Sequence, residues 1–229
     1  MGLKESGLRG SLRNVSVGID AIPDGVVSYY DPKEESVGSI STVSDQQSEF
    51  DLSGEGEIID DGIGGEKTLV IDDSNSFSND DINITTEPFG VVCVFRLPNT
   101  QTRDFLFDSG TELDFGIQDH DSSESLRPFR GGSGENLDDA PSTDTDASVL
   151  VLEGYDTNKL RLEVDGTEFF NGELSAGDLD GLVLGDSGVG EDRSIDVEFG
   201  EFATLKDASR EDFDALRDEF ASIRGISID

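Results

Sequence analysis

The chain has 229 residues, with 52 Asp and Glu against 16 Lys and Arg, and a formal net charge of −36 at pH 7. This balance argues against nucleic-acid binding, because phosphate contacts need clustered basic side chains. A hydrophobic fraction of 34%, with 14 Phe, argues against disorder along the whole chain, since such a sequence can bury a core.

The charge indicates the solvent in which the protein folds. Like charges at this density repel one another and destabilise a compact chain at ordinary ionic strength. In molar salt the Debye length falls to roughly 3 Å, which screens most of the repulsion. The acids are scattered along the sequence rather than gathered in a tail. We therefore expect a salt-adapted surface and a protein that works in near-saturated brine.

Residues 1–20 differ from the rest of the chain. Through residue 19 their only acid is Glu5, against three basic residues and several leucines and valines. We predict an anchoring arm that orders against an acidic partner; a frayed terminus is the alternative. The predicted docking residues are Lys4, Leu8, Arg9, Leu12 and Arg13. The segment lacks the apolar core of a signal peptide, and no stretch approaches the length of a membrane span, so membrane insertion is not expected.

Residues 21–66 are predicted to be an irregular segment with short strands, leading into a β-sandwich over residues 67–229. Short strand candidates separated by Gly and Asp turns follow one another from residue 68 onward, which is typical of an all-β sandwich. The expected strands span residues 68–71, 82–86, 91–97, 103–107, 113–118, 148–155, 159–164, 167–173, 181–184 and 196–204. Residues 119–147 are polar and are predicted to form a long surface loop containing His120.

Two local patterns are specific. Lys159–Val164 alternates apolar and polar residues and meets Asp165-Gly166, a strong hairpin signal. Residues 209–224 are predicted to form the terminal helix, with Ser209 as N-cap and Gly225 as C-cap. Its apolar stripe consists of Phe213, Leu216, Phe220 and Ile223. The single cysteine, Cys93, lies in an apolar run and is predicted to be a buried thiol.

Residues 88–224 resemble the laminin-G and concanavalin A-like lectin jelly rolls. The resemblance is carried by a hairpin at Val164-Asp165-Gly166, a Gly-Leu-Val-Leu-Gly strand at 181–185, and Phe199-Gly200-Glu201-Phe202 before the helix. It implies an all-β jelly-roll sandwich of the lectin and glucanase type, with a short C-terminal helix. Members of the family often bind sugar through a calcium ion and a stacking aromatic ring, whereas this chain has no Trp and three Tyr.

The N-terminal sequence MGLKESGLRGSLRNVSVGIDAIPD, ahead of such a sandwich, is similar to proteins of tailed viruses of haloarchaea. The resemblance implies a virion surface protein (a capsid turret, spike or fibre) on a particle in hypersaline medium. Expected partners are further copies of the chain in a trimer or pentamer, other virion proteins through residues 1–20, and host surface glycans. A stand-alone carbohydrate-binding module of a haloarchaeon is the first alternative.

Enzymatic activity is not expected, and a glycoside hydrolase is the second alternative. Such an enzyme needs two carboxylates about 5–10 Å apart across the scissile bond, and the nearest approach is Asp196 with Glu198. A hard cation, Ca²⁺ or Mg²⁺, is the more plausible metal, because it takes clustered carboxylates. The predicted ligands are Asp119, Asp121, Asp138 and Asp139.

The charge yields the first testable prediction. Raising KCl from dilute buffer to molar concentration should raise the thermal unfolding midpoint, because salt screens the self-repulsion of 36 net negative charges. Circular dichroism at a series of KCl concentrations measures the effect, and a sucrose series separates screening from general solute exclusion. An unfolding midpoint that is independent of KCl would contradict the prediction.

Overall fold

A computed structural model describes residues 22–98, 104–110, 113–120, 125–137, 146–187 and 193–228. The first strands are β1 (Val26–Tyr30), β2 (Gly38–Val43), β3 (Leu52–Ile59), β4 (Thr68–Ile71), β5 (Phe77–Ile84), β6 (Phe89–Arg96), β7 (Phe105–Asp108) and β8 (Phe115–His120). The later strands are β9 (Ser125–Arg130), β10 (Ser133–Gly134), β11 (Ser148–Asp156), β12 (Lys159–Val164), β13 (Thr167–Glu173), β14 (Leu179–Leu184) and β15 (Val197–Lys206). The helices are η1 (Pro32–Glu34), η2 (Ile63–Gly65) and α1 (Arg210–Arg224).

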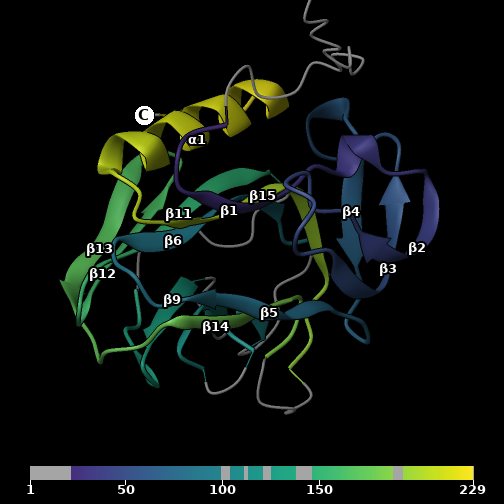
Figure 1. Cartoon of the computed structure of the whole chain (residues 1–229). Helices are drawn as coiled ribbons and strands as arrows, with labels where there is room; N and C mark the ends of the chain where they lie inside the picture. The colour runs from purple at the N-terminus through teal and green to yellow at the C-terminus, as the bar shows by residue number, and fades with distance from the viewer. Residues whose placement is uncertain are drawn as a thin grey trace, which may run out of the picture.

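The strands form one antiparallel sheet that curls into two facing layers. Its hydrogen-bonded order is β10-β9-β8-β7-β14-β5-β3-β4-β15-β6-β11-β12-β13, with β1 added to β15 and β2 added to β3. Figure 1 shows β6, β11 and β15 in one layer, β5, β9 and β14 in the other, and β2, β3 and β4 along one side. The expected all-β sandwich is confirmed.

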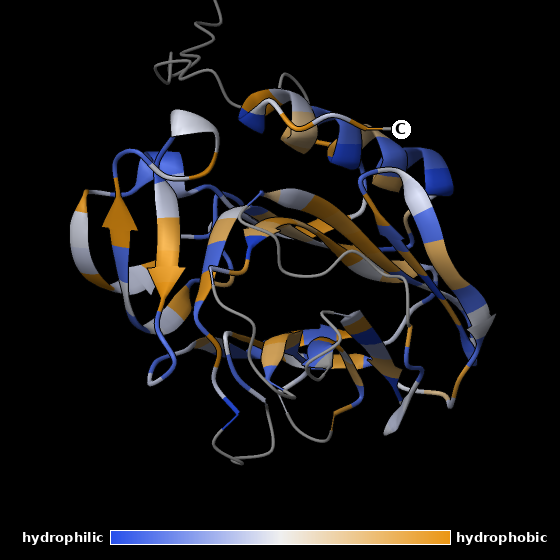
Figure 2. Ribbon diagram, turned by 180° about the vertical axis from the view of Figure 1, so that it is seen from behind, coloured by the Kyte–Doolittle hydropathy of each residue, from blue (hydrophilic) through white to orange (hydrophobic). Residues whose placement is uncertain are grey.

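Strand β6 is covered on both of its faces. Alternation sends Phe89, Val91 and Cys93 into the core between the layers. Val92 and Val94 point the other way, into a second apolar cluster beneath α1. In Figure 2 the ribbon of this layer is coloured largely as hydrophobic. The sequence of β6 is therefore a continuous apolar run, as expected for a strand buried on both sides.

Helix α1 closes the outer face of that layer and confirms the helix predicted from the sequence. The Ser209 side chain and the Asp212 carboxylate form a reciprocal capping box, and Gly225 ends the helix with φ 68°. Phe213, Leu216 and Phe220 are buried against the sheet. Among the described residues, no helix is long and apolar enough to cross a membrane.

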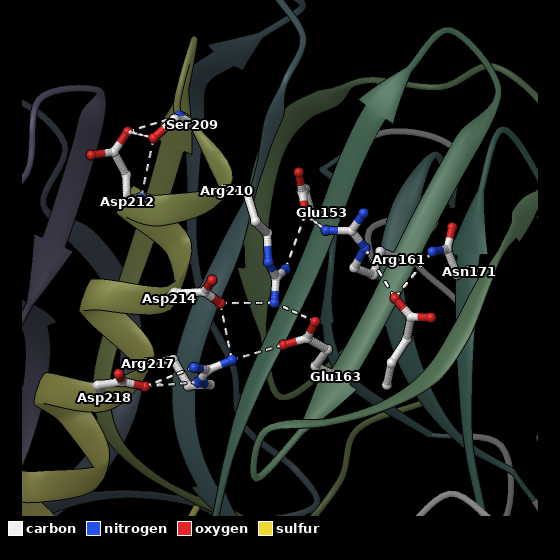
Figure 3. A network of polar contacts seen from close by, with 11 residues as sticks. Glu153, Arg161, Glu163, Asn171, Ser209, Arg210, Asp212, Asp214, Arg217 and Asp218 are labelled. Atoms are coloured by element: carbon white, nitrogen blue, oxygen red, sulfur yellow. Dashed lines mark hydrogen bonds and ion pairs between the residues drawn. The ribbon is translucent and has the colours of Figure 1, made fainter.

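Arginines of α1 bind carboxylates of the sheet (Figure 3). Arg210 Nη1 lies 3.1 Å from Glu153 Oε2 on β11, and Arg217 Nη1 lies 3.0 Å from Glu163 Oε2 on β12. Arg210 also contacts Glu163. Because both glutamates are largely buried, these contacts fix the helix across two strands.

The C-terminal turn of α1 is held by a buried ion pair. Arg224 Nε donates to Glu201 Oε2 at 2.8 Å, and neither side chain is exposed. Arg224 Nη1 also donates to the carbonyls of Ile63 at 3.0 Å and Lys67 at 2.9 Å. Lys33 Nζ lies 3.8 Å from the other Glu201 oxygen. The pair therefore joins α1, η1, η2 and β15 at one point.

The structure corrects the loop predicted for residues 119–147. Residues 125–130 form β9, which pairs with β8, and His120 is the last residue of β8 rather than a loop residue. The sequence does not predict β9, because the buried position at residue 130 is occupied by a charged arginine. Its guanidinium donates to the carbonyls of Lys159 at 2.6 Å and Gly177 at 3.0 Å. A backbone-satisfying arginine thus takes a place that an apolar residue normally fills.

Most other predicted strands are confirmed within two residues, and β4, β12 and β13 have the predicted bounds. The strand predicted at residues 82–86 is longer, because β5 already begins at Phe77. The segment 21–66 contributes β1, β2 and β3 to the common sheet. In β1, Tyr30 faces Phe202 of β15, and residues 38–43 form an entire strand where the sequence is rich in Ser and Gly. This part of the chain is therefore built into the sandwich.

The buried ion pair allows a matched test. Glu201→Leu should lower the free energy of unfolding by about 3–5 kcal/mol, because it leaves the Arg224 charge buried without its partner. Glu198→Leu, on the same strand, should cost less than about 1 kcal/mol, because the Glu198–Arg96 pair is partly exposed. Urea unfolding in molar KCl measures both, and equal losses would contradict the interpretation.

Candidate functional site

A pocket of about 310 Å³ lies between β1, the loop 45–51 and β5. We call it the Phe50 pocket. It is lined by Val26, Val27, Gln47, Glu49, Phe50, Asp81, Asn83 and Lys206. The lining combines an apolar patch with amide, carboxylate and ammonium groups. A volume of this order is at the lower end of small-molecule sites, which start at about 300 Å³.

The loop that carries Gln47, Glu49 and Phe50 is organised by one buried carboxylate. Asp45 is 4% exposed. Its Oδ1 accepts the backbone N–H groups of Tyr29 at 2.9 Å and Gln47 at 3.0 Å. Its Oδ2 accepts those of Glu49 and Phe50, both at 3.1 Å. One side chain therefore satisfies four main-chain donors and fixes the path of the loop.

Further contacts hold the same loop against β1. Tyr30 Oη donates to the Phe50 carbonyl at 2.6 Å, and the Asp45 N–H donates to Asp51 Oδ1 at 2.8 Å. Ser48 has φ 69°, a conformation that is uncommon outside glycine. The loop is thus shaped before any ligand arrives, which reduces the entropy lost on binding.

The opposite wall comes from β5. Asp81 and Asn83 are two positions apart on this strand, and both line the pocket. Asn83 Nδ2 donates to Asp180 Oδ1 at 3.1 Å, and the Asp81 N–H donates to Asn79 Oδ1 at 2.8 Å. The exposed Lys206, at the end of β15, is the one basic residue of the lining.

Phe50 supplies the aromatic surface of the pocket. It is half-buried and packs against the main core together with Val27. The three tyrosines do not offer an equivalent: Tyr29 and Tyr30 are buried, and the Tyr155 ring lies under the Arg161 guanidinium, 5.1 Å from the ring centroid. An aromatic edge beside amide and carboxylate groups suits an amphipathic ring bearing hydroxyls.

The predicted metal ligands are only partly described. Asp119 is buried in β8, where its N–H donates to the Asp104 carbonyl at 2.8 Å. Asp121, Asp138 and Asp139 lie outside the described residues. Within the described ranges, no three His, Cys, Asp or Glu side chains cluster as metal ligands. The Ca²⁺ or Mg²⁺ site therefore stays a prediction.

The carboxylates considered for glycoside hydrolysis have protein partners. Glu198 pairs with Arg96, and Asp196 Oδ1 accepts the Asp73 N–H at 2.9 Å.

A further carboxylate, Asp31, has a shifted pKa. Burial and the neighbouring Glu201 carboxylate raise the pKa of Asp31. Its Oδ1 atom accepts the Lys33 N–H. These contacts hold the turns beside β15 and β1.

The residues predicted to dock the N-terminal arm lie outside the described part of the chain. They are Lys4, Leu8, Arg9, Leu12 and Arg13.

Sequence reasoning missed the Phe50 pocket. Its loop lies in the segment 21–66, for which the sequence predicts an irregular path with short strands. A lone aromatic residue in that polar stretch, five positions after Asp45, was the available signal. The contact from Asp45 to the Tyr29 N–H spans 16 residues and leaves no local pattern.

The site yields a prediction about loop order. Asp45→Asn should lower the free energy of unfolding by about 2–4 kcal/mol, because an amide oxygen replaces a charged acceptor and the amide nitrogen cannot accept. Amide hydrogen exchange at Gln47, Glu49 and Phe50 should accelerate. Asp51→Asn, which removes the charge from the acceptor of one N–H in the same loop, is the control and should have the smaller effect. Unchanged exchange in Asp45→Asn would contradict the assigned role.

Comparisons with known proteins support the fold. No protein-family model and no curated protein sequence matches the chain. Solved structures match it at low identity. Domain 4 of AbnA, an extracellular arabinanase of Geobacillus stearothermophilus, in complex with arabinotriose, has a TM-score of 0.62 and 13% identity, and the match covers 84% of this chain and 98% of that domain.

Two larger proteins match over part of their length. Trypanosoma rangeli sialidase in complex with sialic acid has a TM-score of 0.61 and 16% identity, with 91% of this chain and 35% of the sialidase covered. The binding domain of Paraclostridial Mosquitocidal Protein 1 has a TM-score of 0.62 and 13% identity, with 87% of this chain and 52% of that domain covered. The chain thus spans about a third of the sialidase and half of the toxin domain. It has a lectin-like jelly-roll β-sandwich fold.

Proposed function

We propose that the protein is a non-enzymatic, lectin-like module that binds carbohydrate in the Phe50 pocket. The observation that carries this proposal is the preformed loop, in which Asp45 fixes the positions of Gln47, Glu49 and Phe50 through four backbone hydrogen bonds. Sugars have apolar C–H faces and polar hydroxyl edges. The pocket offers both kinds of surface within about 310 Å³.

The known structures of this fold support the ligand class. The arabinanase domain was solved with arabinotriose and the sialidase with sialic acid. For this chain, Glu49 and Asp81 stand against the single cation Lys206 in the pocket. The net charge of the whole protein is also strongly negative. We therefore expect a neutral sugar rather than a sialic or uronic acid.

Presentation of this module on a virus particle in brine is the second candidate function. It is supported by the basic residues 1–19 in an otherwise acidic chain and by the charge of −36. In this account the sandwich faces the medium and contacts host glycans, while the arm joins the particle. Capsid, portal or tail genes beside the coding gene would support it. A neighbourhood of sugar-uptake or cell-surface genes would favour the stand-alone module.

Glycan binding can be tested with matched variants. On a glycan array in molar KCl, the protein should bind neutral oligosaccharides. Phe50→Ala should weaken the best hit at least tenfold, since losing an aromatic contact costs about 1.4 kcal/mol or more. Val37→Ala, an exposed position outside the pocket (55% exposed), is the control and should bind like the wild type.

The outcomes separate the candidates. Equal binding by the wild type and Phe50→Ala would exclude this pocket, and the absence of any glycan ligand would contradict the function. Hydrolysis of a bound glycan that is abolished by Asp196→Asn or Glu198→Gln would establish the glycoside hydrolase alternative instead.

A further inference from the structure

The Phe50 pocket opens where two paired strands part. Within residues 22–98, β3 and β5 pair at two positions, Ser53 with Ser78 and Gly54 with Phe77. Beyond this pairing, the loop 45–51 runs to one side and the rest of β5 to the other. The pocket takes its lining from both segments, with Gln47, Glu49 and Phe50 from the loop and Asp81 and Asn83 from β5. The pocket is thus a wedge whose apex is the end of the β3–β5 pairing.

The side chain of Asn79 joins the two walls at this apex. Asn79 is half-buried and directly follows the paired Ser78. Its Nδ2 donates to the Asp51 carbonyl of the loop at 2.9 Å, and its Oδ1 accepts the Asp81 N–H of β5 at 2.8 Å. We call these two hydrogen bonds the Asn79 clasp. An amide can make both, whereas a carboxylate of the same shape has no proton to donate to the loop.

The clasp also holds a bulge in the β5 wall. Asn79 is opposite Leu182 of β14. Four residues later, Asn83 is opposite Asp180, which is two positions from Leu182. Strand β5 therefore contains two extra residues here, and such bulges redirect side chains beside binding sites. Asp81, whose N–H is bound by the clasp, lies within the bulge, and its side chain lines the pocket.

The clasp and the buried Asp45 have different roles. Asp45 accepts N–H groups from the loop itself and from Tyr29 of β1. These bonds shape the loop and hold it to β1. The Asn79 clasp connects the loop to β5, and so it governs the distance between the two walls rather than the shape of either wall.

We propose that Asn79 is a positioning residue for sugar binding, which sets the gap between Phe50 and the opposite wall formed by Asp81 and Asn83. The proposal rests on the carbohydrate-binding function proposed above. A sugar ring held between an aromatic surface and polar groups needs both at a fixed separation, because ordering a loose wall on binding costs affinity. Asn79 is not part of the pocket lining, so it acts through the walls.

A fluorescence measurement tests the clasp without any sugar. The chain has no Trp, so Phe50→Trp introduces a single reporter into the loop wall. Adding Asn79→Asp should raise the acrylamide quenching constant of this reporter at least about twofold in molar KCl, because a carboxylate cannot donate to the Asp51 carbonyl. Asn75→Asp adds the same charge at another half-buried amide, whose Nδ2 donates to Asp72, and should leave quenching unchanged. Equal quenching in all three proteins would overturn the proposal.

Calorimetry in molar KCl tests the consequence for binding in the chain with its natural Phe50. The probes are arabinotriose and the neutral oligosaccharide with the strongest array signal. Asn79→Ala removes both bonds of the clasp without adding a charge, and should weaken binding at least about fivefold. Asn75→Ala is the control and should bind like the natural chain.

A double-mutant cycle separates positioning from general damage. In the Phe50→Ala protein, Asn79→Ala should weaken binding by less than about twofold further, because the aromatic contact that the clasp positions is already lost. Equal losses in both backgrounds, or natural affinity in Asn79→Ala, would overturn this proposal and leave sugar binding standing. The absence of sugar binding by the natural chain would instead overturn the proposed function, and this proposal with it. Circular dichroism confirms that each variant is folded.

Discussion

The organising constraint of this structure is the scarcity of positive charge. Sixteen basic residues must accompany 52 acids, and several of the arginines lie where separate elements meet. Arg210 and Arg217 hold α1 to β11 and β12, Arg224 joins the end of the helix to β15, and Arg130 fastens β9 to the turn after β11. Salt screens exposed charges far more than buried pairs. Of the pairs that position elements, the buried Arg224–Glu201 pair is thus the one that added salt should weaken least.

Much of the sandwich could be predicted from local patterns. The alternation in 159–173 and the capping residues of 209–225 are properties of neighbouring residues, so the sequence displays them directly. Strand β9 was missed because Arg130 satisfies distant carbonyls, a role that no local pattern reveals. The Phe50 pocket was missed for a similar reason, since the carboxylate of Asp45 acts on Tyr29, far back in the chain.

The Phe50 pocket is a preformed hollow, in which a buried carboxylate shapes a loop and the loop presents its side chains. A small-molecule site gains from such rigidity, because less conformational entropy is lost when a ligand binds.

The position of strand β6 has a consequence for how the protein unfolds. Its residues alternate between the core of the sandwich and the cluster beneath α1. Lifting the helix uncovers Val92 and Val94 on the back of the strand whose front carries Phe89 and Val91. The two apolar clusters thus share a wall only one strand thick. Helix and sandwich should melt as a single cooperative unit, and the C-terminal helix is a structural member of the domain rather than an appendage.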